Sequence, residues 1–141
     1  MSKTISKFRG TGVAMVTPFK NDGSVNYKEL EKVTQHIIKG KCEYLVVLGT
    51  TGESVTLSKE EKKSVVKCVV ESADKKVPVV LGHGGNNTQE LLEGLNTLDF
   101  KGIDALLSVS PYYNKPTQEG IYQHYKAIAQ NSPLPVILYN V

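Results

Sequence analysis

The fold is decided by one stretch, Tyr44-Leu-Val-Val-Leu-Gly-Thr-Thr-Gly-Glu53, in which an apolar run stops at a polar loop between glycines. An apolar run without polar alternation is typical of a strand covered on both faces, as the strands of parallel sheets are. In folds with such sheets, ligands bind at the carboxyl ends of the strands. The stretch therefore predicts both a parallel sheet and a site at the loop Gly49–Glu53.

The same alternation of an apolar run and an amphipathic stretch repeats along the chain. Short apolar runs predict strands, and the spacing of apolar residues between them predicts helices. Helix starts are marked by capping residues, most clearly by the pair Ser58 and Glu61. The predicted strands are Val13–Thr17, Tyr44–Leu48, Val77–Leu81, Asp104–Val109 and Pro135–Tyr139, and the predicted helices begin near Asn26, Ser58, Thr88 and Thr117.

Two architectures fit four strand–helix repeats followed by a lone strand. One is a five-stranded doubly wound sheet, and the other is the N-terminal half of a (β/α)8 TIM barrel, whose full length is about 250 residues. A last strand that reaches Val141 without a covering helix leaves an apolar face and an unpaired edge. This ending favours the barrel. Residues 1–141 are therefore expected to form a single partial TIM-barrel domain of the α/β class, truncated before strand six.

Charge and composition argue against several classes of partner. The formal net charge is +3, and the basic residues, of which Arg9 is the only arginine, are scattered among acidic ones. This predicts a solvated surface and no nucleic-acid site. No run approaches the roughly 18 apolar residues of a membrane span. Cys42 and Cys68 lack metal-ligand spacing, so a reduced, cytoplasmic protein without a metal is expected.

Hydroxyls and phenols follow the predicted strands, and each group has two interpretations. The threonines and Glu53 of Gly49–Glu53 either satisfy the backbone of a turn or, in the case of the hydroxyls and N–H groups, bind a small anion. Tyr112, Tyr113 and Tyr139 either pack as amphipathic side chains or relay protons with a neighbouring hydroxyl. The sequence alone leaves both pairs of interpretations open.

The three histidines predict no catalytic centre. His83 lies among glycines after a predicted strand, where a structural role is favoured, and Gly82-His-Gly-Gly85 lacks the spacing of a phosphate loop. His36 and His124 fall on helical patterns that predict surface positions.

Two motifs carry a resemblance to a known family. Gly49-Thr-Thr-Gly-Glu-Ser54 and Pro111-Tyr-Tyr-Asn-Lys-Pro-Thr-Gln-Glu-Gly120 stand at the spacing found in the dihydrodipicolinate synthase family, and Leu138-Tyr-Asn-Val141 follows them. That family belongs to the pyruvate-dependent class I aldolases, which include N-acetylneuraminate lyase, and the double tyrosine resembles the synthase branch. The resemblance covers essentially the whole chain and implies the first half of a (β/α)8 barrel.

The resemblance implies a Schiff-base-forming lyase. Pyruvate would form a Schiff base with a lysine and then add to aspartate-4-semialdehyde in the diaminopimelate pathway of lysine biosynthesis, without a cofactor. Thr50, Tyr113 and Tyr139 match the family's proton relay, and Tyr139 also matches the residue that assists Schiff-base formation. Thr51 matches the site for the pyruvate carboxylate. Tyr113 matches a residue that reaches the neighbouring subunit, which implies a homodimer, usually within a homotetramer.

The resemblance also implies a feedback site for lysine, and this chain departs from the pattern there. Lys59 and Lys62 stand where strongly inhibited members tend to carry histidines. Two added cations beside a site for a cationic ligand weaken its binding, so weak or absent inhibition by lysine is expected. The residues that match the feedback site are Ser54, Asn86, Glu90 and Tyr112.

The nucleophile is expected outside this sequence. In the family the Schiff-base lysine lies on strand six, and no lysine of this chain falls in a predicted strand. Lys115 is nearest to the predicted site, but it lies in an open loop, whereas a Schiff-base lysine needs a desolvated position. The chain alone is therefore expected to be inactive. The alternatives are another pyruvate-dependent aldolase or lyase and a non-catalytic half-barrel module.

Overall fold

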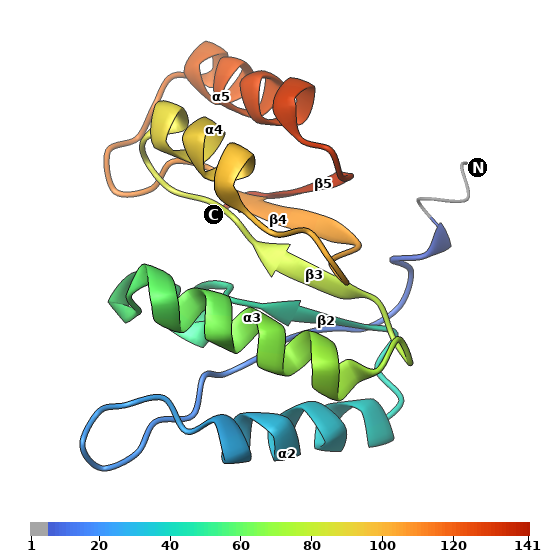
Figure 1. Cartoon of the computed structure of the whole chain (residues 1–141). Coiled ribbons are helices and arrows are strands. Elements are labelled where there is room, and N and C mark those ends of the chain that lie inside the picture. The colour runs from blue at the N-terminus through green and yellow to red at the C-terminus, as the bar shows by residue number, and fades with distance from the viewer. Residues whose placement is uncertain (1–5) are drawn as a thin grey trace.

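Five parallel strands form the sheet of this protein, of which the computed structural model describes residues 6–141. Each strand pairs with the next one along the chain, so the order in space is the order in sequence (Figure 1). A doubly wound sheet would reverse its strand order, so that alternative is wrong. The strands are β1 (Gly12–Ala14), β2 (Tyr44–Val47), β3 (Val79–Gly82), β4 (Ala105–Val109) and β5 (Val136–Tyr139).

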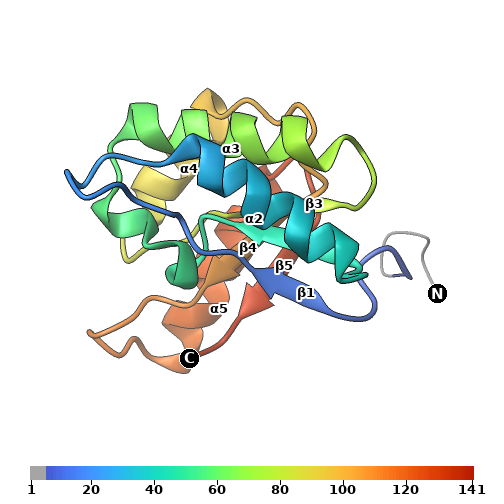
Figure 2. The same cartoon turned by 90° about the horizontal axis from the view of Figure 1, so that it is seen from below.

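The helices lie on one side of the sheet. Figure 2 shows the sheet curling, with the helices arranged in an arc around its outer side. Among residues 6–141, no helix has the length and apolar character that crossing a bilayer requires. The elements outside the sheet are α2 (Tyr27–Lys39), η1 (Thr50–Gly52), η2 (Ser54–Thr56), α3 (Lys59–Ala73), α4 (Thr88–Thr97) and α5 (Gln118–Asn131).

The helix starts follow from local capping, and all four helices begin at or next to the predicted residue. The side chain of Asn26 accepts the backbone N–H of Glu29, and that of Thr117 accepts the N–H of Gly120. Ser58 and Glu61 form the predicted reciprocal capping box. Each such cap stabilises its helix by about 1 kcal/mol, because it satisfies a backbone donor that has no partner inside the helix.

The fourth predicted cap is wrong by one residue. Asn87, and not Thr88, is the N-cap of α4, and its side chain accepts the N–H groups of Gln89 and Glu90. The hydroxyl of Thr88 instead lies 2.7 Å from Nδ1 of His124 on α5. Thr88 therefore contributes to the contact between α4 and α5, and Asn87 caps the helix instead.

The surface position predicted for His124 is also wrong. His124 is only 4% exposed, and it is buried together with Ile128 one turn later on α5. Residues four apart share a helix face, so this pair defines the face that packs inward.

The apolar runs fill two layers of core, as continuous hydrophobicity predicts. Successive residues of a strand point to opposite faces. Leu45 and Val47 pack outward against the helices, whereas Val46 packs on the inner face of the sheet with Val80 and Ala105. Fully burying one such side chain stabilises the fold by about 1.5–3 kcal/mol. The outer layer thus fixes the helices, and the inner layer fixes the curvature that brings the strand ends together.

Candidate active site

The loop after β2 lies between two residues with positive φ, a backbone conformation that an ordinary turn does not require at such residues. Leu48 has a φ of 57° and Glu53 a φ of 53°, both in the left-handed region that side chains with a Cβ disfavour. Between them, Thr50–Gly52 form one short turn of 3-10 helix. Strained residues of this kind persist only where the surrounding structure holds them, and they cluster at functional sites.

A buried contact from the segment that follows β1 holds this loop. The hydroxyl of Thr17, which is 5% exposed, donates to the carbonyl of Gly52 over 2.7 Å. A side chain on residue 52 would place its Cβ 3.1 Å from the carbonyl oxygen of Met15, so the loop lies close against the chain that follows β1. The position of the loop is therefore set from outside the loop itself.

The side chains of the same loop do not satisfy its backbone. The start of η1 has no side-chain cap, and within residues 6–141 the side chains of Thr50, Thr51 and Glu53 make no hydrogen bond. The interpretation in which Thr51 or Glu53 stabilises a plain turn is therefore wrong. Both threonines are exposed, and their hydroxyls are open to a ligand.

The double tyrosine lies on the loop between β4 and α5. The N–H of Tyr112 donates to the side-chain oxygen of Asn86 over 2.8 Å, which ties this loop to the segment before α4. Tyr113 has a φ of 68° and is 93% exposed. A bulky aromatic residue in the left-handed region is a genuine outlier, and this one presents its ring to the outside of the chain.

Tyr139 is the last residue of β5 and is 37% exposed. Its carbonyl oxygen accepts the N–H of Ser110 over 2.9 Å and the hydroxyl of Tyr125 over 2.8 Å. The contact with Tyr125 joins two separate elements, α5 and β5.

The structure places the three residues matched to the proton relay at one edge of the sheet. Thr50 follows β2, Tyr113 follows β4 and Tyr139 ends β5, and these are carboxyl ends of parallel strands. In the part of the chain that is described, no hydrogen bond joins their side chains. The residues share an edge without forming a closed relay, and Tyr113 faces solvent.

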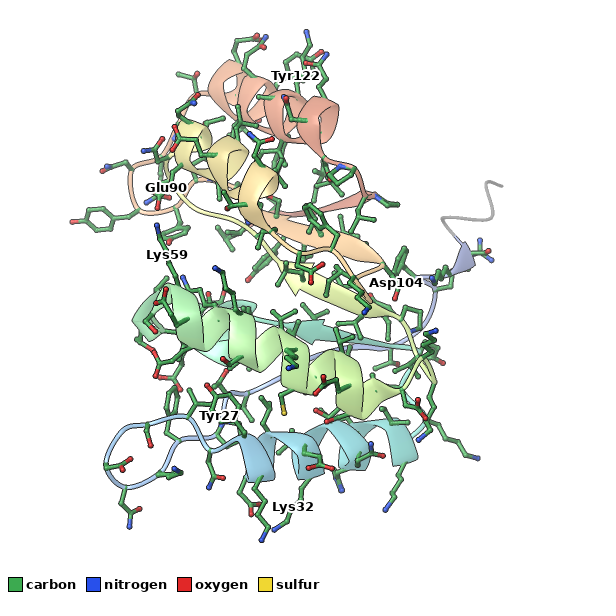
Figure 3. The ribbon with its side chains drawn as sticks, viewed as in Figure 1. Tyr27, Lys32, Lys59, Glu90, Asp104 and Tyr122 are labelled. Carbon is green, nitrogen blue, oxygen red and sulfur yellow. The ribbon has the colours of Figure 1, made fainter. Side chains whose placement is uncertain are left out.

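The residues matched to a feedback site gather near the starts of α3 and α4. Ser54 lies in η2, Asn86 is bound to Tyr112, and Glu90 is an exposed residue of the first turn of α4. Figure 3 shows Lys59, at the start of α3, and Glu90 at the same end of the molecule, on facing helices.

The histidines beside this site have structural contacts. Nε2 of His83 donates to the carbonyl of Leu91 over 2.9 Å, which agrees with the structural role expected from the sequence. Burial lowers the pKa of His83, and this outweighs the opposite effect of that hydrogen bond; the charge of Lys62 lowers the pKa further. Burial also lowers the pKa of His124, whose Nε2 has no partner within residues 6–141. His36 is exposed on α2, as predicted.

Acid is expected to destabilise the protein through His124. Its folded-state pKa lies below the ordinary 6.5, so folding favours the neutral ring. This contribution is complete above pH 6.5 and is lost as pH falls below it, because the unfolded chain then binds the proton more readily. In urea denaturation at pH 7.5 and 5.5, the parent should lose more stability than His124→Asn. His36→Asn is the matched control, and an acid loss that His124→Asn leaves unchanged would contradict the assignment.

Two grooves on the helical side do not coincide with the strand ends. One lies along α2, and the other, between α2 and α3, is lined in part by Tyr27 and Cys68. Burial raises the pKa of Cys68, which makes the thiolate less available. Residues 6–141 contain no group of three or more histidine, cysteine or acidic side chains suited to a metal. The exposed hydroxyls at the strand ends are the better candidate site.

A curled parallel sheet with helices outside and open hydroxyls at its strand ends has the arrangement of a barrel enzyme. The model of the dihydrodipicolinate synthetase family matches residues 7–141, and the chain belongs to that family. One relative, the 4-hydroxy-tetrahydrodipicolinate synthase of Flavobacterium psychrophilum, is 59% identical over 134 residues, which are 95% of this chain and 46% of the relative. The chain thus spans about half the length of the curated relatives it matches.

Solved structures agree on the fold. A dihydrodipicolinate synthase from Acinetobacter baumannii complexed with pyruvate has a TM-score of 0.88 at 50% identity, over 94% of this chain and 45% of its own. A dihydrodipicolinate synthase from Cyanidioschyzon merolae with lysine bound has a TM-score of 0.85 at 39% identity, over 94% of this chain and 46% of its own. N-acetylneuraminate lyase from Mycoplasma synoviae has a TM-score of 0.84 at 30% identity, over 97% of this chain and 48% of its own. The fold is therefore the N-terminal half of a (β/α)8 barrel.

Proposed function

We propose that this chain is the first half of a 4-hydroxy-tetrahydrodipicolinate synthase, which condenses pyruvate with aspartate-4-semialdehyde. The observation that carries the proposal is the loop Gly49–Glu53, which is held by Thr17 from the segment after β1 while Thr50 and Thr51 stay open to a ligand. On this proposal, residues 1–141 are one partial barrel domain. The full-length enzyme is these residues joined to the second half of the family's fold.

The chemistry divides between the two halves. A lysine of the second half attacks the carbonyl carbon of pyruvate and releases water, which leaves a Schiff base. Loss of a proton from the methyl carbon then gives the nucleophile that adds to the aldehyde carbon of the second substrate. These steps need an anion site and proton carriers, and the chain offers hydroxyls for both. We assign Thr51 and its N–H to the pyruvate carboxylate, and Thr50, Tyr113 and Tyr139 to proton transfer.

The relay needs a second copy of the chain. Tyr113 is 93% exposed and points its ring away from its own fold, although its backbone is held in a strained conformation. A second copy that donates this phenol to the neighbouring site explains why an exposed aromatic residue is positioned so specifically. We therefore propose a homodimer, usually paired into a homotetramer. The two free cysteines, Cys42 and Cys68, suit the reducing cytoplasm.

Among residues 6–141, no lysine is placed to act as the Schiff-base nucleophile. The five strands contain no lysine, and Lys115 is exposed in the loop before α5. An amine in that position stays solvated, whereas a Schiff-base lysine is activated by desolvation or by a neighbouring cation. We infer that the 141-residue chain alone has no synthase activity and that no external cofactor is needed.

The experiment that tests the function is an assay of the full-length enzyme with pyruvate and aspartate-4-semialdehyde. Turnover of this pair, without cleavage of N-acetylneuraminate, supports the synthase. Cleavage of N-acetylneuraminate, or of another substrate that yields pyruvate, would assign the chain to a different lyase of the superfamily. The absence of both reactions would favour a half-barrel module without catalysis.

Lysine is expected to inhibit the full-length enzyme weakly. We propose that Ser54, Asn86, Glu90 and Tyr112 form a lysine site, and Lys59 stands at the same end of the molecule. Its charge, together with that of Lys62, opposes the binding of a cationic effector by Coulomb repulsion.

The double variant Lys59→His, Lys62→His should therefore lower the lysine concentration for half-inhibition about tenfold at low salt, since removing two charges is worth about 1 kcal/mol or more there. Lys28→His on α2 is the control. Inhibition of the parent by sub-millimolar lysine would contradict the prediction.

A further inference from the structure

The hydroxyl of Tyr125 contacts the main chain of the residue assigned to proton transfer. Tyr125 lies on α5, is half-buried, and donates to the carbonyl of Tyr139 over 2.8 Å. Burial raises the pKa of Tyr125, and a hydrogen bond with Ser110 partly offsets this. The phenol therefore keeps its proton at neutral pH and stays available as a donor.

The carbonyl of Tyr139 is held from two sides. Besides Tyr125, it accepts the N–H of Ser110, which continues the pairing of Val109 with Tyr139. A carbonyl oxygen has two lone pairs, so these two donors use its full capacity. Ser110 fixes the strand end within the sheet, and Tyr125 fixes it against the helix.

Packing alone does not hold this end of β5. Leu138 is 59% exposed and Tyr139 is 37% exposed, whereas residues at the middle of the sheet, such as Leu106, are fully buried. Within residues 6–141, hydrogen bonds therefore contribute a large share of the restraint on the Tyr139 backbone. The ring of His124 stands edge-on to that of Tyr125 at 5.6 Å and supports it from the side that faces α4.

We propose that Tyr125 is a positioning residue for Tyr139. This rests on the proposed function, in which the phenol of Tyr139 carries a proton to and from the reacting pyruvate. Proton transfer requires the donor and acceptor atoms to be within hydrogen-bond reach, and a displacement of about 1 Å can cost up to 100-fold in rate. Tyr125 touches no substrate in this account, and it acts by fixing the strand end from which the phenol of Tyr139 projects.

The test is Tyr125→Phe in the full-length enzyme, with Tyr122→Phe as the matched control. Tyr122 lies on the same helix, is 57% exposed, and contacts Lys126 only through its ring, which phenylalanine retains. Figure 3 shows Tyr122 on the outer side of α5. Tyr125→Phe should lower kcat about fivefold while the KM for pyruvate stays within about twofold, because the hydroxyl loses its hydrogen bonds to the Tyr139 carbonyl and to Ser110 while the carboxylate site is untouched. Tyr122→Phe should change neither.

A double-mutant cycle separates positioning from general destabilisation. In the background of Tyr139→Phe, the further change Tyr125→Phe should have no effect on kcat, because the group that it positions is already gone. Additive losses, or a kcat unchanged by Tyr125→Phe alone, would overturn the proposal. If the parent enzyme turns over both substrates and Tyr125→Phe has normal activity, only this inference is contradicted. If the parent enzyme has no synthase activity, both the proposed function and this inference are contradicted.

Discussion

Replacing Tyr139 with phenylalanine is expected to lower kcat of the full-length enzyme by about 100-fold or more, which is the usual contribution of a positioned general acid or base. The substitution removes one oxygen atom and keeps the ring, so the strand end retains its packing and its two backbone hydrogen bonds from Ser110 and Tyr125. Steady-state kinetics with both substrates measures the effect. The KM for pyruvate should change much less than kcat, since the carboxylate is assigned to Thr51.

The control for this variant is Tyr27→Phe on α2. Tyr27 is 38% exposed, almost the same as Tyr139 at 37%, but it lies on α2, in the groove between α2 and α3. Its activity should equal that of the parent. Combining Tyr139→Phe with Thr50→Val should cost little more than Tyr139→Phe alone, because members of one relay act as a unit. Full activity of Tyr139→Phe would remove Tyr139 from the mechanism.

Replacing Gly82 with alanine is expected to destabilise the fold by about 3 kcal/mol or more, which places it among the severe single substitutions. A Cβ at this position would lie 2.2 Å from the carbonyl oxygen of Leu48 and 2.8 Å from the N of Gly49. These are backbone atoms and cannot rotate away, so β2 and β3 would have to separate at their carboxyl ends. The loop with Thr50 and Thr51 would move with them.

Gly85→Ala, three residues further on, is the matched control. There the nearest neighbour of a new Cβ is a methyl of Leu91 at 3.7 Å, an ordinary contact, and the backbone conformation is open to alanine. Thermal and urea denaturation of both variants should show a large loss for Gly82→Ala and a change of less than about 1 kcal/mol for Gly85→Ala. Equal effects would show that the approach of Leu48 to Gly82 is not a constraint.

Much of the fold could be predicted because its signals are local. Each strand is a short apolar run, and the caps at Asn26, Ser58 and Thr117 involve residues within three positions of one another. The first strand shows where such signals weaken. The predicted Val13–Thr17 pairs as a strand only over Gly12–Ala14, although the N–H of Met15 still donates to Val46. Beyond it the chain leaves the sheet, and Thr17 supports the loop after β2.

What the sequence could not predict depends on contacts between distant residues. Asn87 and Thr88 are equally good caps by local rules, and only the partner on α5, 36 residues from Thr88, decides between them. The same contact buries His124, which a helical pattern places at the surface. The contact of Tyr125 with Tyr139 has no local signal either, because two elements must first be packed before the hydroxyl meets the carbonyl.

The position of the candidate site could be predicted from the sequence, but its backbone conformation and the exposure of its side chains could be predicted only in part. The carboxyl ends of parallel strands follow from the strand assignment, so Thr50, Thr51 and Tyr139 could be placed at one edge. The geometry contradicts the interpretation in which the side chains of this loop cap a turn, and the anion-binding interpretation stays a prediction. The left-handed backbone of Leu48 and Tyr113 was not predictable, because neither residue type favours it and the surrounding structure imposes it.

The proposed division of the active site between two halves is tested most directly by trapping the Schiff base. The full-length enzyme is incubated with pyruvate, reduced with borohydride, digested, and mapped by mass spectrometry, and the 141-residue chain is treated in parallel. We predict one modified lysine outside residues 1–141 and no stable adduct on the chain alone. A reduced pyruvate adduct on a lysine within residues 1–141, such as Lys115, would contradict it.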